Sequence, residues 1–140
     1  MSVPVPSSHL DLVNGKVIGV FTTMMPDGQP QSSLVWLNYD GECVRVNTTL
    51  ERRKGRNLVA NARCSVRVVD PNDTSRYIQV RGDAELVFEG AVDHLDALTR
   101  SYTKYPCFYG HVYPEEQRSR ETRVICRLHA RRITLDAIHR

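Results

Sequence analysis

Basic side chains concentrate in one short stretch of the chain, and their spacing suits the binding of an anionic group. Seven arginines and lysines but only one acid, Glu51, fall between Arg45 and Arg67. Arg52 and Lys54 stand where a strand-like pattern gives way to a helical one. The first turn of a helix offers unpaired N–H groups and a partial positive charge, both of which favour a phosphate. The stretch predicts a phosphate cradle, although composition alone fits a solvated helix face equally well.

The elements that must position this cradle are strands on one side and a helix on the other. Strand patterns cover 17–24, 31–39, 42–48, 65–69, 76–88, 121–128 and 133–138, and helical spacing covers 7–13, 50–62 and 91–105. Thr48 and Glu51 have the spacing of a capping box, which predicts that the second helix begins at Leu50. Gly82 predicts a bulge in the fifth strand.

Hairpin-linked antiparallel strands, about six in number, with one short and one longer helix predict a mainly β fold in which a small barrel is flanked by helices. Closing the sheet would remove its exposed edges. An OB-fold or another small β-barrel fits the strand content equally well. The length of 140 residues fits one domain, 1–140.

Composition excludes several classes of protein. The longest apolar runs are too short to cross a bilayer, so we expect no membrane partner. The N-terminal residues lack the pattern of a secretory signal, which favours a cytoplasmic location. The net charge of +3 is only mildly basic, so we expect no nucleic-acid partner.

The cysteines and histidines show no spacing typical of a metal site. No two of the four cysteines form a Cys-x-x-Cys pair, and three of the four lie in apolar strand patterns. We therefore expect buried, reduced thiols and no bound metal. Ser-His-Asp or Cys-His catalysis has no supporting motif either.

The order of residues says more than their spacing. The run Asn47-Thr48-Thr49-Leu50-Glu51-Arg52-Arg53-Lys54-Gly55-Arg56-Asn57-Leu58 resembles the Ser-Thr-Thr-x-x-Arg-x-Lys-x-Arg-Asn-Leu motif of the flavin and deazaflavin split-barrel oxidoreductases, in the pyridoxamine 5′-phosphate oxidase-like superfamily. The resemblance extends through 27–31, 34–36, 62–66, 82–86 and 121–125, in the family's order. It implies a six-stranded antiparallel split barrel that forms a homodimer, with a cofactor ring in each groove at the subunit interface.

The resemblance also implies roles for particular residues. Arg52 and Lys54 would bind the cofactor phosphate, supported by Asn57 and Arg56. The ribityl chain or ring edge would contact Asn47, Thr48 and Thr49. The ring would be lined by Gln31, Ser33 and Val35, and Tyr77 and Gln79 would reach the site across the dimer interface.

Coenzyme F-420 is the cofactor that the resemblance favours, with FMN as the alternative. A lysine two residues after the arginine is shared with F-420 users, and Arg53 and Arg56 offer charge for an oligoglutamate tail. The implied function is hydride transfer between F-420 and an electron-poor small molecule. Since the cofactor would carry the chemistry, we expect no catalytic side chain. The loop 104–114 would either cover the substrate or simply connect the helix to the last strands.

Two other functions stay open at this point. A split barrel of this kind could bind a flavin or a haem-type ligand without turnover. An OB-like barrel could bind single-stranded nucleic acid through the basic stretch, with Trp36, Tyr39 and Tyr77 as stacking residues.

Overall fold

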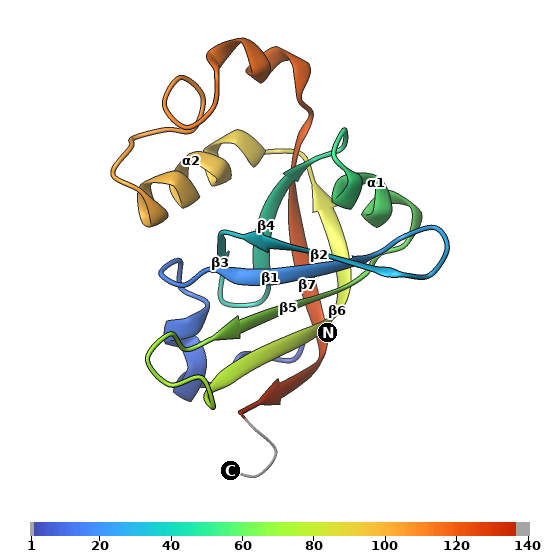
Figure 1. Cartoon of the computed structure of the whole chain (residues 1–140), viewed down its shortest axis with the longest axis vertical. Coiled ribbons are helices and arrows are strands. Elements are labelled where there is room, and N and C mark those ends of the chain that lie inside the picture. Colours follow the sequence, from blue (N-terminus) through green and yellow to red (C-terminus); the bar gives the residue numbers. More distant parts are fainter. Residues whose placement is uncertain (1, 137–140) are drawn as a thin grey trace.

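A seven-stranded antiparallel sheet, strongly curled, forms the body of the molecule (Figure 1). The computed structural model describes residues 2–136. The strands in this part of the chain are β1 (Gly19–Met24), β2 (Pro30–Val35), β3 (Leu37–Tyr39), β4 (Val44–Thr49), β5 (Arg63–Val69), β6 (Tyr77–Val87) and β7 (Arg123–Leu135). The helices are α1 (Arg53–Ala60) and α2 (Ala91–Tyr102), with 3-10 turns η1 (Ser7–Leu12) and η2 (Glu115–Arg120). The strand order is β2-β1-β5-β6-β7-β4-β3.

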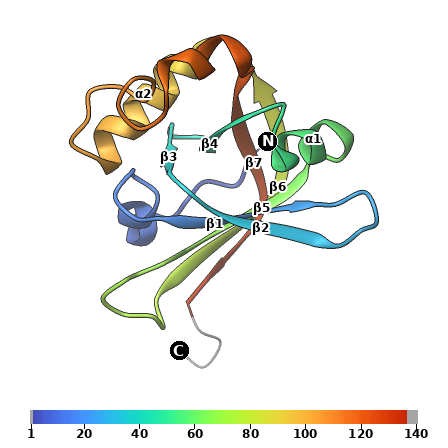
Figure 2. The ribbon, with the colours of Figure 1, turned by 45° about the horizontal axis from the view of Figure 1, so that its top comes forward.

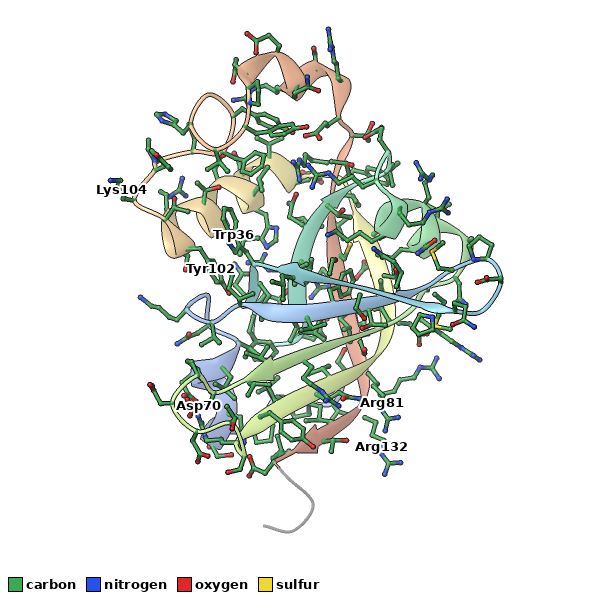
Figure 3. All side chains as sticks on the ribbon, viewed as in Figure 1. Trp36, Asp70, Arg81, Tyr102, Lys104 and Arg132 are labelled. Carbon is green, nitrogen blue, oxygen red and sulfur yellow. The ribbon has the colours of Figure 1, made fainter. Side chains whose placement is uncertain are left out.

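The two edge strands of this sheet, β2 and β3, are consecutive in sequence and are separated by Trp36 alone. One residue therefore carries the chain from one edge of the sheet to the other and draws the sheet into a half-closed barrel. Helix α2 holds this corner. Tyr102 stacks on Trp36 with ring centroids 5.6 Å apart, and its hydroxyl accepts a hydrogen bond from the Leu37 N–H at 3.1 Å. Figure 3 shows the two rings lying together beside the end of α2.

The core fills the inside of the curl with alternate residues of the strands. Strand β5 shows the alternation clearly, because Cys64, Val66 and Val68 are buried while the residues between them are not. Phe21, Leu37, Ile78 and Leu128 are among the largest side chains in this core. Helix α2 and the segment after it lie across one end of the barrel (Figure 2). Neither helix in residues 2–136 has the length and apolar content needed to span a bilayer.

The predicted mainly β split-barrel fold is confirmed, with seven strands in place of six. The predicted strand 31–39 is split at Trp36 into β2 and β3. The predicted strands 121–128 and 133–138 are one continuous strand, β7, as far as Leu135, and positions 137 and 138 lie outside the described residues. The bulge predicted at Gly82 is confirmed, because the β6–β7 register shifts between Arg81 and Gly82.

The predicted start of the first α-helix is wrong by three residues, since α1 begins at Arg53 and not at Leu50. Thr48 cannot cap the helix because its side chain is buried. The Thr49 hydroxyl instead accepts a hydrogen bond from the Arg52 N–H at 3.2 Å. The Glu51 carboxylate accepts from the Thr122 N–H at 2.8 Å, which ties the turn before α1 to the start of β7.

Candidate functional site

A cavity of about 360 Å³ lies at the end of the barrel that α2 covers. Its walls come from the residue before β1, from the end of β2 and Trp36, from the junction of β4 with α1, from α2, from the loop after α2 and from the start of β7. The lining residues are Ile18, Leu34, Val35, Trp36, Asn47, Arg52, Lys54, Leu95, Leu98, Phe108, Val112 and Arg123. The volume falls in the range of small-molecule sites, roughly 300–1,000 Å³.

One end of the cavity is cationic, and Lys54 is a partly buried charge there. The Lys54 Nζ donates a hydrogen bond to the Ser33 hydroxyl at 3.1 Å, which holds the side chain across the gap between α1 and β2. Burial lowers the pKa of Lys54, and repulsion from the Arg52 guanidinium lowers it further. A bound anion would offset both effects.

A buried polar network adds a third cation to the same end. The Arg123 guanidinium donates to Glu121 at 3.0 Å, to the Tyr109 hydroxyl at 2.9 Å and to the Asn47 side-chain oxygen at 3.3 Å. Arg52 reaches the other oxygen of Glu121 at 3.6 Å. Arg52 and Arg123 thus share the Glu121 carboxylate. Together with Lys54, this end of the cavity carries about two net positive charges to face an anionic ligand.

Helix α1 can lie close enough to β4 to bring Lys54 into the cavity because residue 55 is glycine. A Cβ at Gly55 would lie 1.9 Å from the carbonyl oxygen of Thr49 and 3.0 Å from the Cα of Leu50. Both contacts are with backbone, so a side chain at this position would push the helix away. Glycine disfavours a helix interior by about 1 kcal/mol relative to alanine, but here it allows the close approach.

Apolar side chains form most of the rest of the cavity wall. Trp36 and Phe108 meet edge to face with their ring centroids 6.4 Å apart, and Leu95 and Leu98 present the buried face of α2. Leu34 stands on the rim with 74% of its surface exposed. In the loop 104–114, Phe108 and Val112 line the cavity while Tyr109 is buried in the connection between α2 and β7.

The structure brings a large part of the predicted site together. Val35, Asn47, Arg52 and Lys54 line the cavity, and Ser33 contacts Lys54. The Asn47 amide nitrogen is already engaged, since it donates to the Ala91 carbonyl at 2.8 Å and to the His94 Nδ1 at 3.1 Å.

The other predicted residues lie outside the cavity lining. The buried Thr48 hydroxyl has no hydrogen-bond partner within residues 2–136, and Thr49 shapes the turn before α1. The buried Asn57 side chain donates to the Thr23 hydroxyl at 3.0 Å and so holds α1 on β1. Arg56 folds back onto the Glu51 carbonyl. Gln31 accepts from Thr23, and Tyr77 and Gln79 both contact Arg67 on the outer face of the sheet.

Arg123 is the important cavity residue that the sequence did not single out. It was visible only as part of the run 121–125, whose pattern is that of a strand. A charged residue directly before the apolar run Val124-Ile125-Cys126 was the available signal. Its significance depends on β7 pairing with β4, which sets Arg123 opposite Thr49 at the cradle.

Comparison with known proteins places this arrangement in a family. The family model described as pyridoxamine 5′-phosphate oxidase matches residues 6–135. The chain belongs to the pyridoxamine 5′-phosphate oxidase family. The matched segment includes all seven strands and both α-helices of the described residues. The family model therefore covers the complete sheet and not only the segment around the cavity.

Solved structures similar to this member of the family support the assignment. One carries the name F420 reductase; it is 30% identical, with a TM-score of 0.78 over 93% of this chain and 98% of that one. A conserved hypothetical protein from Mycobacterium tuberculosis is 27% identical, with a TM-score of 0.72 over 96% of this chain and 86% of that one. HupZ of Group A Streptococcus is 16% identical, with a TM-score of 0.66 over 94% and 93%, and shares the fold.

The residues around the cavity of this family member fit a flavin-type cofactor. Such a cofactor combines a flat aromatic ring with an anionic chain. The apolar wall of Val35, Trp36 and Phe108 suits the ring, and the cationic end at Arg52 and Lys54 suits the anionic group. The close approach of α1 to β4 at Gly55 keeps the two ends within one cavity.

Proposed function

We propose that the protein is an oxidoreductase that binds coenzyme F-420 in this cavity and transfers a hydride between it and an electron-poor small molecule. The observation that carries the proposal is the meeting of Arg52, Lys54 and Arg123 at one end of an otherwise largely apolar cavity. Its support comes from membership of an oxidoreductase family and from the 30% identity to a protein named F420 reductase.

Within this proposal the side chains bind and orient. Arg52 grips the anionic group with its planar fork, and Lys54 supplies a compact charge from the Ser33 side. Trp36 and Phe108 exclude water from the ring, and the cofactor supplies the hydride chemistry. Tyr109 serves as a structural residue, since its hydroxyl donates to Glu121 at 2.6 Å and accepts from Arg123.

The preference for F-420 over FMN rests on charge beyond the phosphate cradle. Arg53 and Arg56 are exposed on α1 and line a shallow pocket next to it, together with Met24, Pro26 and Asn57. An oligoglutamate tail that leaves the cradle along α1 would meet these two arginines. FMN has no such tail, so the two cofactors should respond differently to the loss of this charge.

A homodimer is part of the same proposal. Leu34, Val20, Arg67 and Gln79 are successive cross-strand neighbours on the outer face of the sheet. The rim of the cavity at Leu34 thus continues into the surface that carries Gln79 and Tyr77. A second copy packed on this face would cover the exposed apolar side chains and could bring its own Tyr77 and Gln79 to the cavity.

The first test compares cofactor affinity in matched double variants. Arg52→Ala with Lys54→Ala should weaken binding of F-420 and of FMN by at least 100-fold, because two charge-assisted contacts are lost at about 1.5–3 kcal/mol each. The control, Lys16→Ala with Arg63→Ala, removes one lysine and one arginine outside the cavity and should bind like the wild type. Fluorescence or absorption titration measures both affinities. Equal affinity in the two double variants would refute the site.

The second test separates the two cofactors and the two functions. Arg53→Ala with Arg56→Ala should weaken F-420 binding about tenfold and leave FMN binding unchanged. Equal effects on both cofactors would contradict the preference for F-420.

Wild-type protein with reduced F-420 should then reduce a panel of enones and quinones. Tight binding without turnover of any acceptor would favour the non-catalytic alternative.

A further inference from the structure

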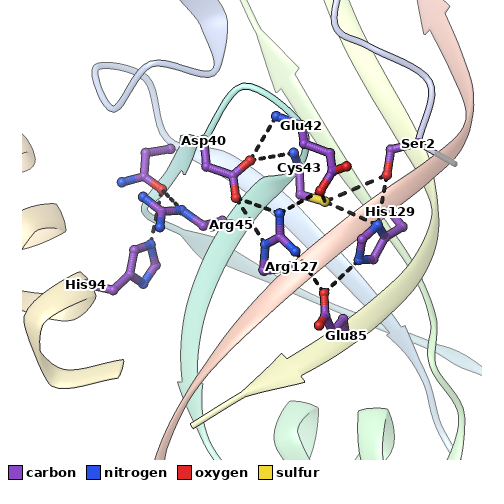
Figure 4. A network of polar contacts seen from close by, with 10 residues as sticks. Ser2, Asp40, Glu42, Cys43, Arg45, Glu85, His94, Arg127 and His129 are labelled. Carbon is purple, nitrogen blue, oxygen red and sulfur yellow. Dashed lines mark hydrogen bonds and ion pairs between the residues drawn. The ribbon is translucent and has the colours of Figure 1, made fainter. Parts of the chain in front are cut away.

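A second cluster of polar side chains lies away from the cavity, at the start of β4 and in the middle of β7 (Figure 4). Cys43 lies opposite His129 because Val44 pairs with Leu128 in the antiparallel β4–β7 ladder. Glu42 precedes Cys43 in the turn, and Ser2 is held beside β7 by a hydrogen bond from the Val3 N–H to the Ala130 carbonyl at 2.9 Å. No residue of this cluster lines the cavity.

The distance between Cys43 and His129 is that of two ligands in a tetrahedral metal site, and Glu42 lies close to both. The Cys43 Sγ lies 3.4 Å from the His129 Nδ1 and 4.0 Å from a carboxylate oxygen of Glu42. One ligand atom from each of these residues lies within 4.8 Å of the others. Tetrahedral Zn²⁺ with Zn–S near 2.3 Å and Zn–N near 2.0 Å separates its sulfur and nitrogen ligands by about 3.5 Å. The thiol and the imidazole are therefore already at ligand spacing.

The second ring nitrogen of His129 has a carboxylate partner. The Nε2 atom lies 2.8 Å from a carboxylate oxygen of Glu85. A carboxylate oxygen is an acceptor, so this contact favours the tautomer with the proton on Nε2. In that tautomer the lone pair of Nδ1 faces the Cys43 sulfur and the Ser2 hydroxyl. A zinc-bound histidine usually donates its other ring N–H to a carboxylate or a carbonyl, which fixes the orientation of the ring.

Charge and access favour a divalent cation at this place. Arg127 forms ion pairs of 2.9 Å with Asp40, Glu42 and Glu85, so three carboxylates surround one guanidinium. The Cys43 side chain is buried, whereas the side chains of Glu42 and His129 are 60% and 38% exposed and leave a way in. A sulfur, nitrogen and oxygen donor set suits Zn²⁺ rather than Mg²⁺ or Ca²⁺.

We propose that Cys43, His129 and Glu42 bind one Zn²⁺ per chain, with water as the fourth ligand. The ion would join the turn before β4 to β7, and the Ser2 hydroxyl, 2.8 Å from the His129 Nδ1, would lie at its edge. This site is separate from the cavity, because the two share no residue. Sequence analysis predicted no metal site, since 86 positions separate Cys43 from His129 and only strand pairing brings them together.

Titration with Co²⁺ as a spectroscopic substitute for Zn²⁺ tests the proposal on the full chain. The wild type should show a thiolate-to-cobalt charge-transfer band that saturates at one ion per chain and disappears when Zn²⁺ is added. His129→Asn retains the thiol but loses the ligand nitrogen, and its affinity should fall roughly 100-fold. Cys43→Ser should abolish the band. Cys107→Ser, which removes a thiol outside the cluster, should behave like the wild type.

Thermal unfolding provides an independent readout. Excess Zn²⁺ should raise the Tm of the wild type and of Cys107→Ser but not that of His129→Asn, because an ion that binds only the folded chain stabilises it. Absence of the charge-transfer band in folded wild-type protein would overturn the proposal. A band that survives unchanged in Cys43→Ser or His129→Asn would overturn it as well.

Discussion

Lys54 holds its charge where burial and a neighbouring cation both oppose ionisation. The unfolded chain binds a proton at this lysine more readily than the folded chain does. The contribution of Lys54 to stability is therefore unfavourable at neutral pH and improves as pH rises towards the ordinary lysine pKa of 10.5. An anion in the cavity would reverse this penalty. The residue is placed to favour a ligand rather than the fold alone.

His94 is a second residue whose charge the fold opposes. Burial, reinforced by the positive charge of Arg45, lowers its pKa from 6.5 to about 4, and Asp40 opposes the change only partly. The neutral ring links α2 to the barrel, because Nδ1 accepts from Asn47 and Nε2 donates to the Asn38 oxygen at 3.1 Å. Protonation would remove the acceptor and place a charge in the core.

The pH dependence of stability should reveal this residue. Between pH 6.5 and about 4 the unfolded chain takes up a proton that folded His94 does not. The free energy of unfolding therefore decreases as the pH is lowered through this window. The loss reaches about 3 kcal/mol, since a pKa difference of one is worth about 1.4 kcal/mol. Urea unfolding at pH 7, 6, 5 and 4 should show a flatter profile for His94→Gln. Parallel profiles would contradict the assignment.

Sequence predicted the residues of the cradle better than the residues that support it. Arg52 and Lys54 lie within one local motif, so their order alone indicates what they do. Arg123 and His94 depend on contacts between elements that are far apart in the chain, and local sequence does not identify the partners in those contacts. Arg56 shows the reverse case, because it belongs to the motif but turns onto the Glu51 carbonyl.

At the scale of elements, the contact of α1 with β4 sets the position of the cradle. Gly55 permits this contact. Its backbone is not in the left-handed region, so its conformation alone does not require a glycine. Helix propensity alone would favour alanine here by about 1 kcal/mol. The overlap of a Cβ with the Thr49 carbonyl opposes that gain and has no flexible side chain to relieve it.

Gly55→Ala should therefore destabilise the protein by about 2 kcal/mol and weaken cofactor binding, because α1 must shift and carry Lys54 with it. Denaturant unfolding and cofactor titration measure the two effects. Val59→Ala, on the exposed side of the same helix, is the control and should change stability by less than about 0.5 kcal/mol. A Gly55→Ala protein as stable as the wild type would show that the helix is not held this closely.

Element boundaries were harder to predict than element types. The helix began three residues late because Thr49 and Glu51 used their side chains in the preceding turn, a competition that the capping-box spacing does not reveal. Strand 31–39 was broken at Trp36 because the barrel turns there. Its apolar pattern continues through the corner, so periodicity gave no sign of the break.

At the scale of the whole molecule, the curl of the sheet separates an inner core from an outer face that carries exposed apolar side chains. Ile18, Val20 and Leu34 gather on this outer face beside the cavity. Such a patch next to a binding site is typical of a protein–protein contact. The proposed homodimer would bury it and complete the cavity wall.

Leu34→Asp should shift the protein from dimer to monomer and lower cofactor affinity at least tenfold, because a carboxylate would then be buried unpaired in the interface. Analytical ultracentrifugation and cofactor titration measure the two effects. Val59→Asp places the same charge on an exposed side chain of α1 and should remain dimeric. A wild type that sediments as a monomer, or a Leu34→Asp protein that stays dimeric, would contradict the dimer.

Trp36 is the single tryptophan of the chain, and it stands both in the one-residue link between the edge strands and in the wall of the cavity. The intrinsic fluorophore of the molecule therefore lies both at the corner that closes the barrel and in the wall of the cavity. Opening of the corner would expose the indole to water and shift its emission to the red. A bound ring that absorbs in the near ultraviolet would quench the emission by energy transfer. Emission wavelength and intensity would thus report separately on folding and on binding in the unmodified chain.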